Sequence, residues 1–260
     1  MNGFLLQLEK TGKDMSHFFV TSNQVSGEIL TILGDDVNHM KNVLRMRTGE
    51  AFTAADENGV FYHCEVDTLE KQEVTAKIMW KEQGTSELSS KLYLFQGLPK
   101  SDKMEMIIQK AVELGVYAII PVATKRAIVK LDAKKEASKL KRWQAIAEGA
   151  AKQSGRMLVP QIHGVHTFQE ALQMAKELDI NLIPYECARG MEVTREIFSS
   201  IQSGMSVGIF IGPEGGFEES EVEQAKELDV KPVTLGKRIL RTETAGLTTL
   251  SILMYLLEES

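Results

Sequence analysis

The sequence predicts an α/β domain with a mainly parallel sheet, preceded by a small β-barrel with one helix. Short extended segments and turns fill residues 17–81, and they include Asn58-Gly59, a pair that strongly favours hairpin turns. From residue 91 onward, strand-like and helical segments alternate, which is typical of an α/β fold. We therefore expect an N-terminal extension at residues 1–14, the barrel at 15–86 and the α/β domain at 87–260.

The first region is expected to hold four strands and one helix. Its extended runs are residues 17–20, 50–54, 60–66 and 74–80. The helix is expected at residues 35–44. A polar stretch at residues 82–90 then has the composition of a linker.

The second region is expected to alternate strands and helices. Strands are predicted at residues 92–98, 116–122, 180–184, 207–211 and 233–235. A helix is expected to begin at Asp102, with Glu105 completing a capping box, and a long helix is expected at residues 134–153. The last helix is expected from Thr242, with one apolar face formed by Leu250, Leu253, Met254 and Leu257.

The composition is that of a globular protein with a sizeable core, since 43% of the 260 residues are hydrophobic and 25% are charged. No apolar run is long enough to span a bilayer, and the N-terminus lacks the basic lead of a signal peptide. Cys64 and Cys187 lie far apart and match no metal-binding spacing. We expect both to be reduced core thiols in a cytoplasmic protein.

Basic residues gather in the middle of an acidic chain. The net charge is −6, yet residues 100–156 hold 13 Lys and Arg against six Asp and Glu. This concentration predicts a surface for a polyanion, although a solvated, lysine-rich helix face explains it nearly as well. The candidate phosphate contacts are Arg45, Arg47, Lys103, Lys125, Arg126, Lys135, Lys139, Arg142, Lys152 and Arg156.

A glycine-rich turn follows the predicted strand at residues 207–211. Ligands of open α/β sheets bind beyond the carboxyl ends of the strands, where the run Gly212-Pro213-Glu214-Gly215-Gly216 would lie. Carboxylates crowd the start of the next helix, so a cationic ligand or a neutral adenosine fits better than a phosphate. An ordinary tight turn remains the alternative.

A second unusual segment, residues 235–246, precedes the last helix. Thr242 or Thr244 can serve as its N-cap, and Glu243 suits the first turn of a helix. Arg238 and Arg241 are unfavourable there, which indicates an anionic partner. No dinucleotide fingerprint, Walker A motif or nucleophile elbow is present, and no metal site is expected.

These two segments resemble the paired C-terminal motifs of the ribosomal RNA small-subunit methyltransferase E family. That family belongs to the SPOUT class of methyltransferases, whose chains are knotted. The motifs are GPEGG after a buried strand and then LGKRILRTETAGL. Earlier runs agree, namely HFFV, HMKNVLRMRTGE, KSDKMEMIIQKAVELGV and RWQAIAEGAAKQSGR. The resemblance covers residues 15–257, nearly the whole chain.

The resemblance implies a PUA-like RNA-binding barrel, a SPOUT domain with a C-terminal trefoil knot, and a homodimer. It implies S-adenosyl-L-methionine as cofactor and methylation of a uridine N3 in 16S ribosomal RNA within the small subunit. The implied cofactor residues are Tyr185, Gly212, Pro213, Glu214, Gly215, Gly216, Leu235, Gly236, Ile239, Leu240 and Thr242. The resemblance also implies that the basic residues named above as candidate phosphate contacts bind RNA.

For the chemistry, Glu243 is the expected general base and Arg241 the group that stabilises the developing uracil anion or holds a phosphate. Two other functions remain open. One is a SPOUT methyltransferase that acts on another RNA. The other is a non-catalytic RNA-binding ribosome-assembly factor, which leaves the two C-terminal motifs unexplained.

Overall fold

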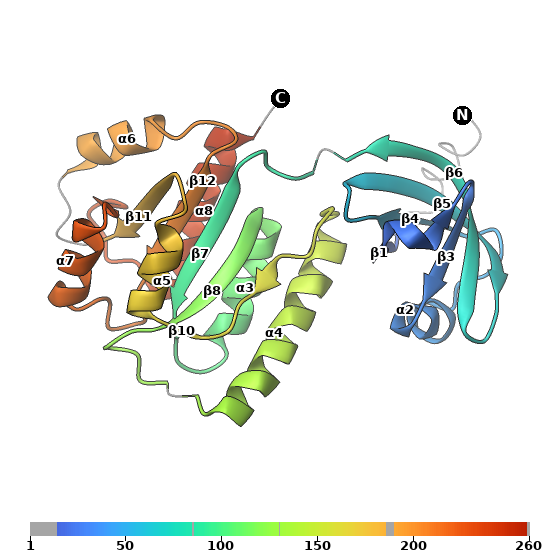
Figure 1. Cartoon of the computed structure of the whole chain (residues 1–260), viewed down its shortest axis with the longest axis horizontal. Coiled ribbons are helices and arrows are strands. Elements are labelled where there is room, and N and C mark those ends of the chain that lie inside the picture. The colour runs from blue at the N-terminus through green and yellow to red at the C-terminus, as the bar shows by residue number, and fades with distance from the viewer. Residues whose placement is uncertain (1–14, 85, 130, 186–189, 259–260) are drawn as a thin grey trace. The chain divides into compact units, whose positions relative to one another are not determined.

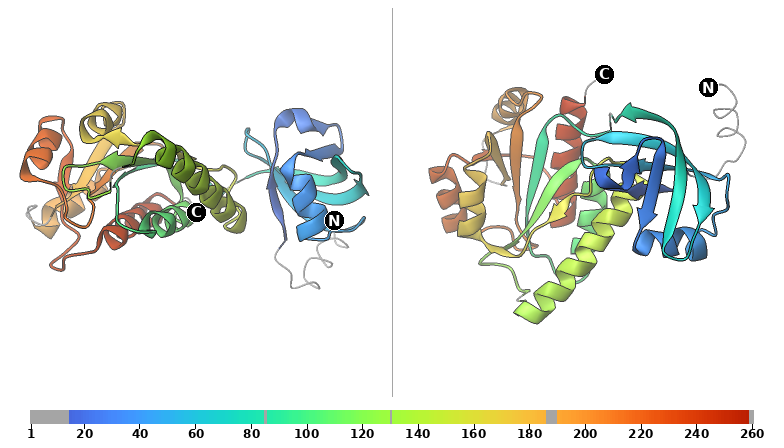
Figure 2. Two further views of the ribbon diagram at one scale, coloured as in Figure 1. Left: turned by 90° about the horizontal axis from the view of Figure 1, so that it is seen from below. Right: turned by 45° about the vertical axis from the view of Figure 1, so that its right-hand side comes forward.

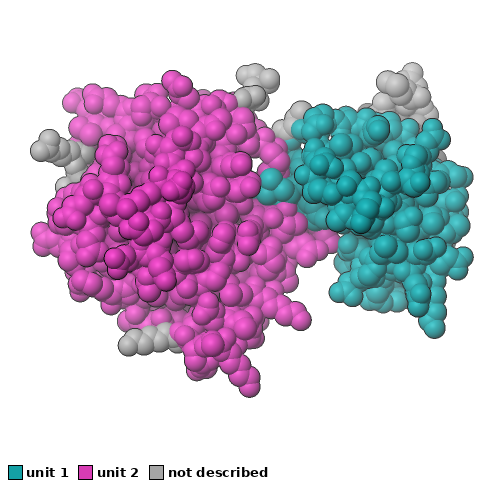
Figure 3. All heavy atoms as spheres, in the orientation of Figure 1, with its two compact units in different colours: residues 1–86, 155–158 teal, residues 87–154, 159–260 magenta. Residues whose placement is uncertain are grey.

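The computed structural model describes residues 15–84, 86–129, 131–185 and 190–258, and the chain divides into two compact units. Unit 1 comprises Met1–Ser86 and Gly155–Leu158, and unit 2 comprises Glu87–Ser154 and Val159–Ser260 (Figure 3). Residues 1–14 and Cys187 lie outside the described part of the chain. Among the described residues, no helix has the length and apolar character needed to cross a membrane.

Unit 1 is built on a six-stranded mixed sheet, in the order β1-β4-β5-β6-β3-β2 (Figure 1). β1 and β4 are parallel, and the other neighbouring strands are antiparallel. The strands are β1 (His17–Phe19), β2 (Val25–Ser26), β3 (Ile29–Leu33), β4 (Ala51–Ala55), β5 (Val60–Leu69) and β6 (Glu73–Gln83). The four predicted strands are confirmed, whereas β2, β3 and the short 3-10 helix η1 (Ser22–Gln24) escape the sequence pattern.

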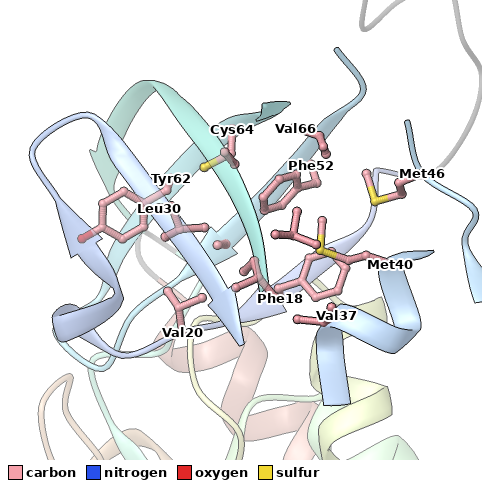
Figure 4. Packing of buried hydrophobic residues seen from close by; sticks show 14 residues of the cluster. Phe18, Val20, Leu30, Val37, Met40, Met46, Phe52, Tyr62, Cys64 and Val66 are labelled. Atoms are coloured by element: carbon pink, nitrogen blue, oxygen red, sulfur yellow. The ribbon is translucent and has the colours of Figure 1, made fainter. Parts of the chain in front are cut away.

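Every second side chain along the strands of unit 1 points inward, and these side chains form its core. Tyr62, Cys64 and Val66 of β5 point inward and pack with Phe18 and Phe52 (Figure 4). Cys64 is a free, buried cysteine, as the sequence predicts, and burial raises the pKa of its thiol to about 12. The predicted helix begins as α2 (Asp35–Asn38) and continues as the π-helix η2 (His39–Val43).

A short segment from the middle of the chain completes unit 1. Gly155–Leu158 follows helix α4 (Ala133–Gln153) and belongs to unit 1 rather than to unit 2. A Cβ on Gly84 would lie 2.0 Å from the sulfur of Met157, so the glycine allows the segment to pack directly beside the end of β6. The side chain of Met157 is buried as a result.

Unit 2 contains a seven-stranded parallel sheet, which confirms the predicted mainly parallel sheet and adds the short strands β9 and β10 to the five predicted ones. The order is β10-β8-β7-β12-β11-β13, with β9 paired to β8. The strands are β7 (Lys91–Gly97), β8 (Val116–Ala123), β9 (Gln161–Ile162), β10 (His166–Thr167), β11 (Ile180–Pro184), β12 (Ser206–Ile211) and β13 (Lys231–Val233). The predicted strand at residues 233–235 therefore ends two residues early, and residues 234–241 form a loop.

Helices cover both faces of this sheet (Figure 2). α5 (Phe168–Ala175) and α7 (Glu219–Glu227) share a core with the stacked rings of Phe95 and Phe210. On the other face lie α3 (Lys103–Glu113) and α8 (Thr242–Leu257), which pack together. α6 (Met191–Ser199) contacts β13.

The predicted capping box at the start of α3 does not form. Asp102 precedes the helix without an extended backbone and makes no side-chain cap hydrogen bond. The carboxylate of Glu105 accepts a hydrogen bond from Arg142 on α4 at 2.7 Å instead. A contact with a distant helix thus replaces the local one.

Candidate functional site

Several strands of the parallel sheet end at one edge, and the unusual segments follow them. β7, β12 and β11 are neighbours, and they lead into residues 98, 212 and 185 respectively. β13 leads into the loop at residues 234–241. This is the edge at which parallel α/β sheets bind ligands.

The glycine turn after β12 folds tightly onto the end of β7. A Cβ on Gly97 would lie 2.7 Å from the backbone nitrogen of Pro213, and one on Gly212 would lie 2.9 Å from the carbonyl carbon of Gly216. Real Cβ atoms do not approach backbone so closely, so both positions require glycine. The amide of Gly216 donates to the Pro213 carbonyl at 2.8 Å and closes the turn.

The start of α8 is tied to this turn by a buried hydroxyl group. Thr242 Oγ1 donates to the carbonyl of Gly212 at 2.6 Å and accepts from Gln96 Nε2 at 2.9 Å. Thr242 is therefore not the N-cap of α8. Arg241 holds that position without a side-chain cap hydrogen bond, so neither threonine caps the helix.

A pocket of about 670 Å³ opens between these segments. All eleven predicted cofactor residues line it: Tyr185, Gly212, Pro213, Glu214, Gly215, Gly216, Leu235, Gly236, Ile239, Leu240 and Thr242. Arg238 and Arg241, which the sequence singled out, line it as well, together with Lys103 and Arg126 from the predicted phosphate contacts. Phe217, Thr234 and Lys237 also line it and were not among the named candidates. The structure thus brings together segments that lie between residues 103 and 245 of the sequence.

Glu243 lies beside this pocket rather than in its lining. It borders a neighbouring apolar groove formed by α8 and Met106 of α3. Its atom Oε2 is buried and lies 3.4 Å from the Lys103 ammonium. The Glu243 carboxylate is therefore held in an ion pair at the edge of the pocket.

Lys103, one of the predicted phosphate contacts, lines the pocket and pairs with two carboxylates. Its Nζ atom lies 3.0 Å from Glu214 Oε1 and 3.4 Å from Glu243 Oε2. The hydrogen bond to Glu214, with the charge of Glu243, raises the pKa of Lys103. Desolvation opposes the shift at Glu214, but its hydrogen bonds to backbone N–H groups and to Lys103 lower the pKa of that carboxyl.

The loop after β8 carries two of the predicted RNA contacts, and it is hydrogen-bonded to the glycine turn and to the start of α7. Arg126 Nη1 donates to the carbonyl of Gly215 at 2.9 Å. The amide of Lys125 donates to Glu221 Oε1 at 2.9 Å, and its Nζ donates to Ser220 Oγ. Glu221, a buried carboxylate at the start of α7, is therefore committed to holding this loop.

The remaining basic candidates are divided between the two units. On α4, Lys135, Arg142 and Lys152 pair with Asp132, Glu105 and Glu148 respectively. Arg156 is only 4% exposed, which contradicts its prediction as a phosphate contact, because a buried guanidinium cannot reach RNA. Arg45 and Arg47 are exposed and belong to unit 1, whereas Lys139 lies on α4 of unit 2.

Known proteins resemble both units. Residues 86–254 match a family model described as an RNA methyltransferase domain, and residues 32–79 match an RNA methyltransferase PUA domain. The ribosomal RNA small subunit methyltransferase E of Bacillus subtilis is 40% identical over 247 residues, which cover 93% of this chain and 96% of the relative. The protein of that name from Mesomycoplasma hyopneumoniae is 36% identical, with 91% and 98% covered.

Solved structures of similar proteins point to the same family. A crystal structure of a ribosomal RNA small subunit methyltransferase E from Neisseria gonorrhoeae, bound to S-adenosyl methionine, is 35% identical with a TM-score of 0.80, and the match covers 94% of this chain and 98% of that one. A putative methyltransferase from Legionella pneumophila, also with this cofactor, is 29% identical with a TM-score of 0.82 over 94% and 98% of the two chains. The chain therefore belongs to the ribosomal RNA small subunit methyltransferase E family.

Proposed function

We propose that this protein transfers a methyl group from S-adenosyl-L-methionine to N3 of a uridine in 16S ribosomal RNA of the small subunit. The observation that carries the proposal is the pocket at the carboxyl edge of the sheet, where the glycine turn meets the start of α8. Relatives that cover nearly the whole chain are named as small-subunit ribosomal RNA methyltransferases.

The residues of the pocket fit this cofactor. The volume of about 670 Å³ lies within the range of small-molecule sites. Gly212, Gly215, Gly216 and Gly236 line the pocket without side chains, so adenosine and methionine groups can approach main-chain N–H and C=O groups there. Glu214 adds a carboxylate to the lining, which suits a ligand with a sulfonium and an ammonium group.

The chain's own residues would prepare the uridine for attack. When bound, S-adenosyl-L-methionine supplies an electrophilic methyl group. N3 of uridine carries a proton and is a poor nucleophile, so we assign Glu243 as the base that takes this proton. The place of Glu243 in the first turn of α8, two residues after the pocket-lining Arg241, supports the assignment. Arg241, which lines the pocket, would stabilise the negative charge that then develops on the uracil.

A trefoil knot is part of this proposal. β13 lies at the sheet edge beyond β11, whereas α8 packs against β12 and β7. The loop at residues 234–241 must therefore bring the chain back across two strands, past the glycine turn to which Thr242 is bonded. Such a return path supports a knot at the cofactor site, a rare topology in proteins.

A homodimer and a PUA-like, RNA-binding unit 1 complete the proposal. The groove on α8 carries exposed apolar side chains, among them Tyr255 and Leu256, which are 81% and 50% exposed. Exposed apolar patches of this kind mark interaction sites. We place the protein in the cytoplasm, where ribosomal subunits are modified, and the proposed proton transfer requires no metal.

The proposal is tested by methyl transfer from labelled S-adenosyl-L-methionine to small subunits that lack this modification, with free ribosomal RNA and transfer RNA alongside. Label recovered as N3-methyluridine in 16S RNA is the expected result. Label on transfer RNA alone would mean that the substrate is wrong. No label and no cofactor binding would favour a non-catalytic assembly factor.

A further inference from the structure

Three charged side chains from three segments meet at the edge of the cofactor pocket, which Lys103 and Glu214 line and Glu243 adjoins. Lys103 is the first residue of α3, Glu214 belongs to the glycine turn, and Glu243 lies in the first turn of α8. The Lys103 ammonium lies 3.0 Å from Glu214 Oε1 and 3.4 Å from Glu243 Oε2. One cation thus connects the pocket lining to the proposed base.

The location of Lys103 is unfavourable apart from these two contacts. Backbone N–H groups at the start of a helix carry partial positive charge, so a lysine in the first turn is repelled by its own helix. The side chain is only 29% exposed, which also excludes a fully solvated role. The two carboxylates offset both costs.

Removing the ammonium would set two carboxylates against each other. The oxygens of Glu214 and Glu243 both lie within contact distance of one nitrogen atom, and their side chains are 27% and 14% exposed. Partly buried like charges at such a separation repel each other and move apart. Glu214 is also held by the amide of Lys100 at 3.1 Å, so Glu243 is the carboxylate with more freedom to move.

We infer that Lys103 is a positioning residue that fixes the Glu243 carboxylate relative to the glycine turn, and so couples cofactor occupancy of that turn to the placement of the base. This inference rests on the proposed function. A change at the turn that moves Glu214 is transmitted through the ammonium to Glu243. A phosphate contact by Lys103 would instead affect RNA affinity.

The test compares Lys103→Met with Lys103→Arg in the full chain, with S-adenosyl-L-methionine and unmodified small subunits. Lys103→Met should lower kcat by roughly tenfold or more, with the KM for subunits within about twofold, because the base is misplaced rather than the RNA lost. Lys103→Arg keeps the charge and should recover most of the loss. The control is Lys110→Met, since Lys110 lies on the same helix and pairs with Glu113, outside the pocket lining.

A double-mutant cycle separates positioning from a general structural effect. If Lys103 acts through Glu243, then Lys103→Met should have little further effect on kcat in a Glu243→Gln background. An equal loss in both backgrounds, or a rise in KM alone, would overturn the inference. If Lys103→Met does not fold, as judged by circular dichroism, then Lys103→Gln takes its place in the same cycle.

The outcome for the proposed function is read separately. If Glu243→Gln alone turns over like the parent protein, the assignment of the base fails and the coupling fails with it. If the parent protein methylates no RNA, the proposed function itself fails. If Glu243→Gln lowers kcat as expected and the effect of Lys103→Met simply adds to that loss, only the coupling is rejected.

Discussion

At the scale of single residues, the hydroxyl group of Thr242 holds together segments from three parts of the chain. It joins Gln96 at the end of β7, the carbonyl of Gly212 in the turn, and the first residue of α8. Gln96 and Thr242 are buried and Gly212 is half-buried, so an unmet hydrogen bond here is costly. The shape of the pocket therefore depends on one oxygen atom.

Thr242→Val should both destabilise the protein and weaken cofactor binding. The Gly212 carbonyl loses its donor and the Gln96 amide loses an acceptor, at a cost of roughly 1–3 kcal/mol. Urea unfolding and calorimetric titration with S-adenosyl-L-methionine measure the two effects. Thr249→Val is the matched control, because that buried hydroxyl donates only to Ala245 within α8. Equal cofactor affinities in the two variants would contradict the role of Thr242.

Glu243→Gln should lower turnover far more than it changes cofactor affinity. Loss of a general base typically costs about 10²–10⁴-fold in rate, and Glu243 does not line the cofactor pocket. Single-turnover methylation of small subunits measures the rate.

Arg241→Ala should also lose methylation with little loss of stability, since the Arg241 side chain is exposed. If Arg241→Ala does not fold, its role is structural.

Site residues could be predicted only where the local pattern is unusual. The turn at residues 212–216 and the arginines near Thr242 stand out within a few residues of sequence. Gly97 does not stand out, because the residue that requires a glycine there is Pro213, which lies more than a hundred positions later. The same holds for Gln96 and for Lys103, whose partners are known only once the sheet is formed.

At the scale of elements, helix α4 is less available to RNA than its lysine-rich sequence suggests. Lys135 and Arg142 pair with Asp132 and Glu105 on the protein itself. Exposed pairs of this kind contribute at most about 1 kcal/mol, so RNA phosphate can still compete for the cations. The interaction of α4 with RNA thus stays a prediction.

Changing Lys135, Lys139 and Arg142 together to Glu should weaken RNA binding and reduce its dependence on salt. Each phosphate contact that is lost lowers the slope of log K against log salt by about one. Binding titrations at several salt concentrations give the slope. The control reverses three lysines outside the basic segment, namely Lys176, Lys226 and Lys231. An unchanged slope would remove this face from the interface.

Strongly periodic elements were the predictable ones. The apolar runs of β8 and β12 and the long α4 appear where the pattern places them, within one or two residues. The capping box at Asp102 fails because Glu105 finds a stronger partner in Arg142. β3 is missed because its pairing with β6, more than forty residues away, decides its structure.

At the scale of the whole molecule, the apolar face of α8 is the strongest argument for a dimer. Tyr255→Glu combined with Leu256→Glu should convert a dimer into a monomer, because two charges would be buried without partners. Light scattering after size-exclusion chromatography measures the mass. The control is Met191→Glu, since Met191 is also an exposed apolar residue, on α6. A monomeric parent protein would refute the proposed dimer.

Unit 1 contains Gly155–Leu158, whose Met157 packs against Gly84. During translation, residues 15–84 emerge from the ribosome well before this segment does. At about 5–20 residues per second, the nascent unit waits roughly 4–14 seconds for the piece that covers the end of β6. A chaperone or the ribosome surface can occupy that site in the interval. Synthesis of a fragment that stops at residue 86 would leave the site permanently exposed.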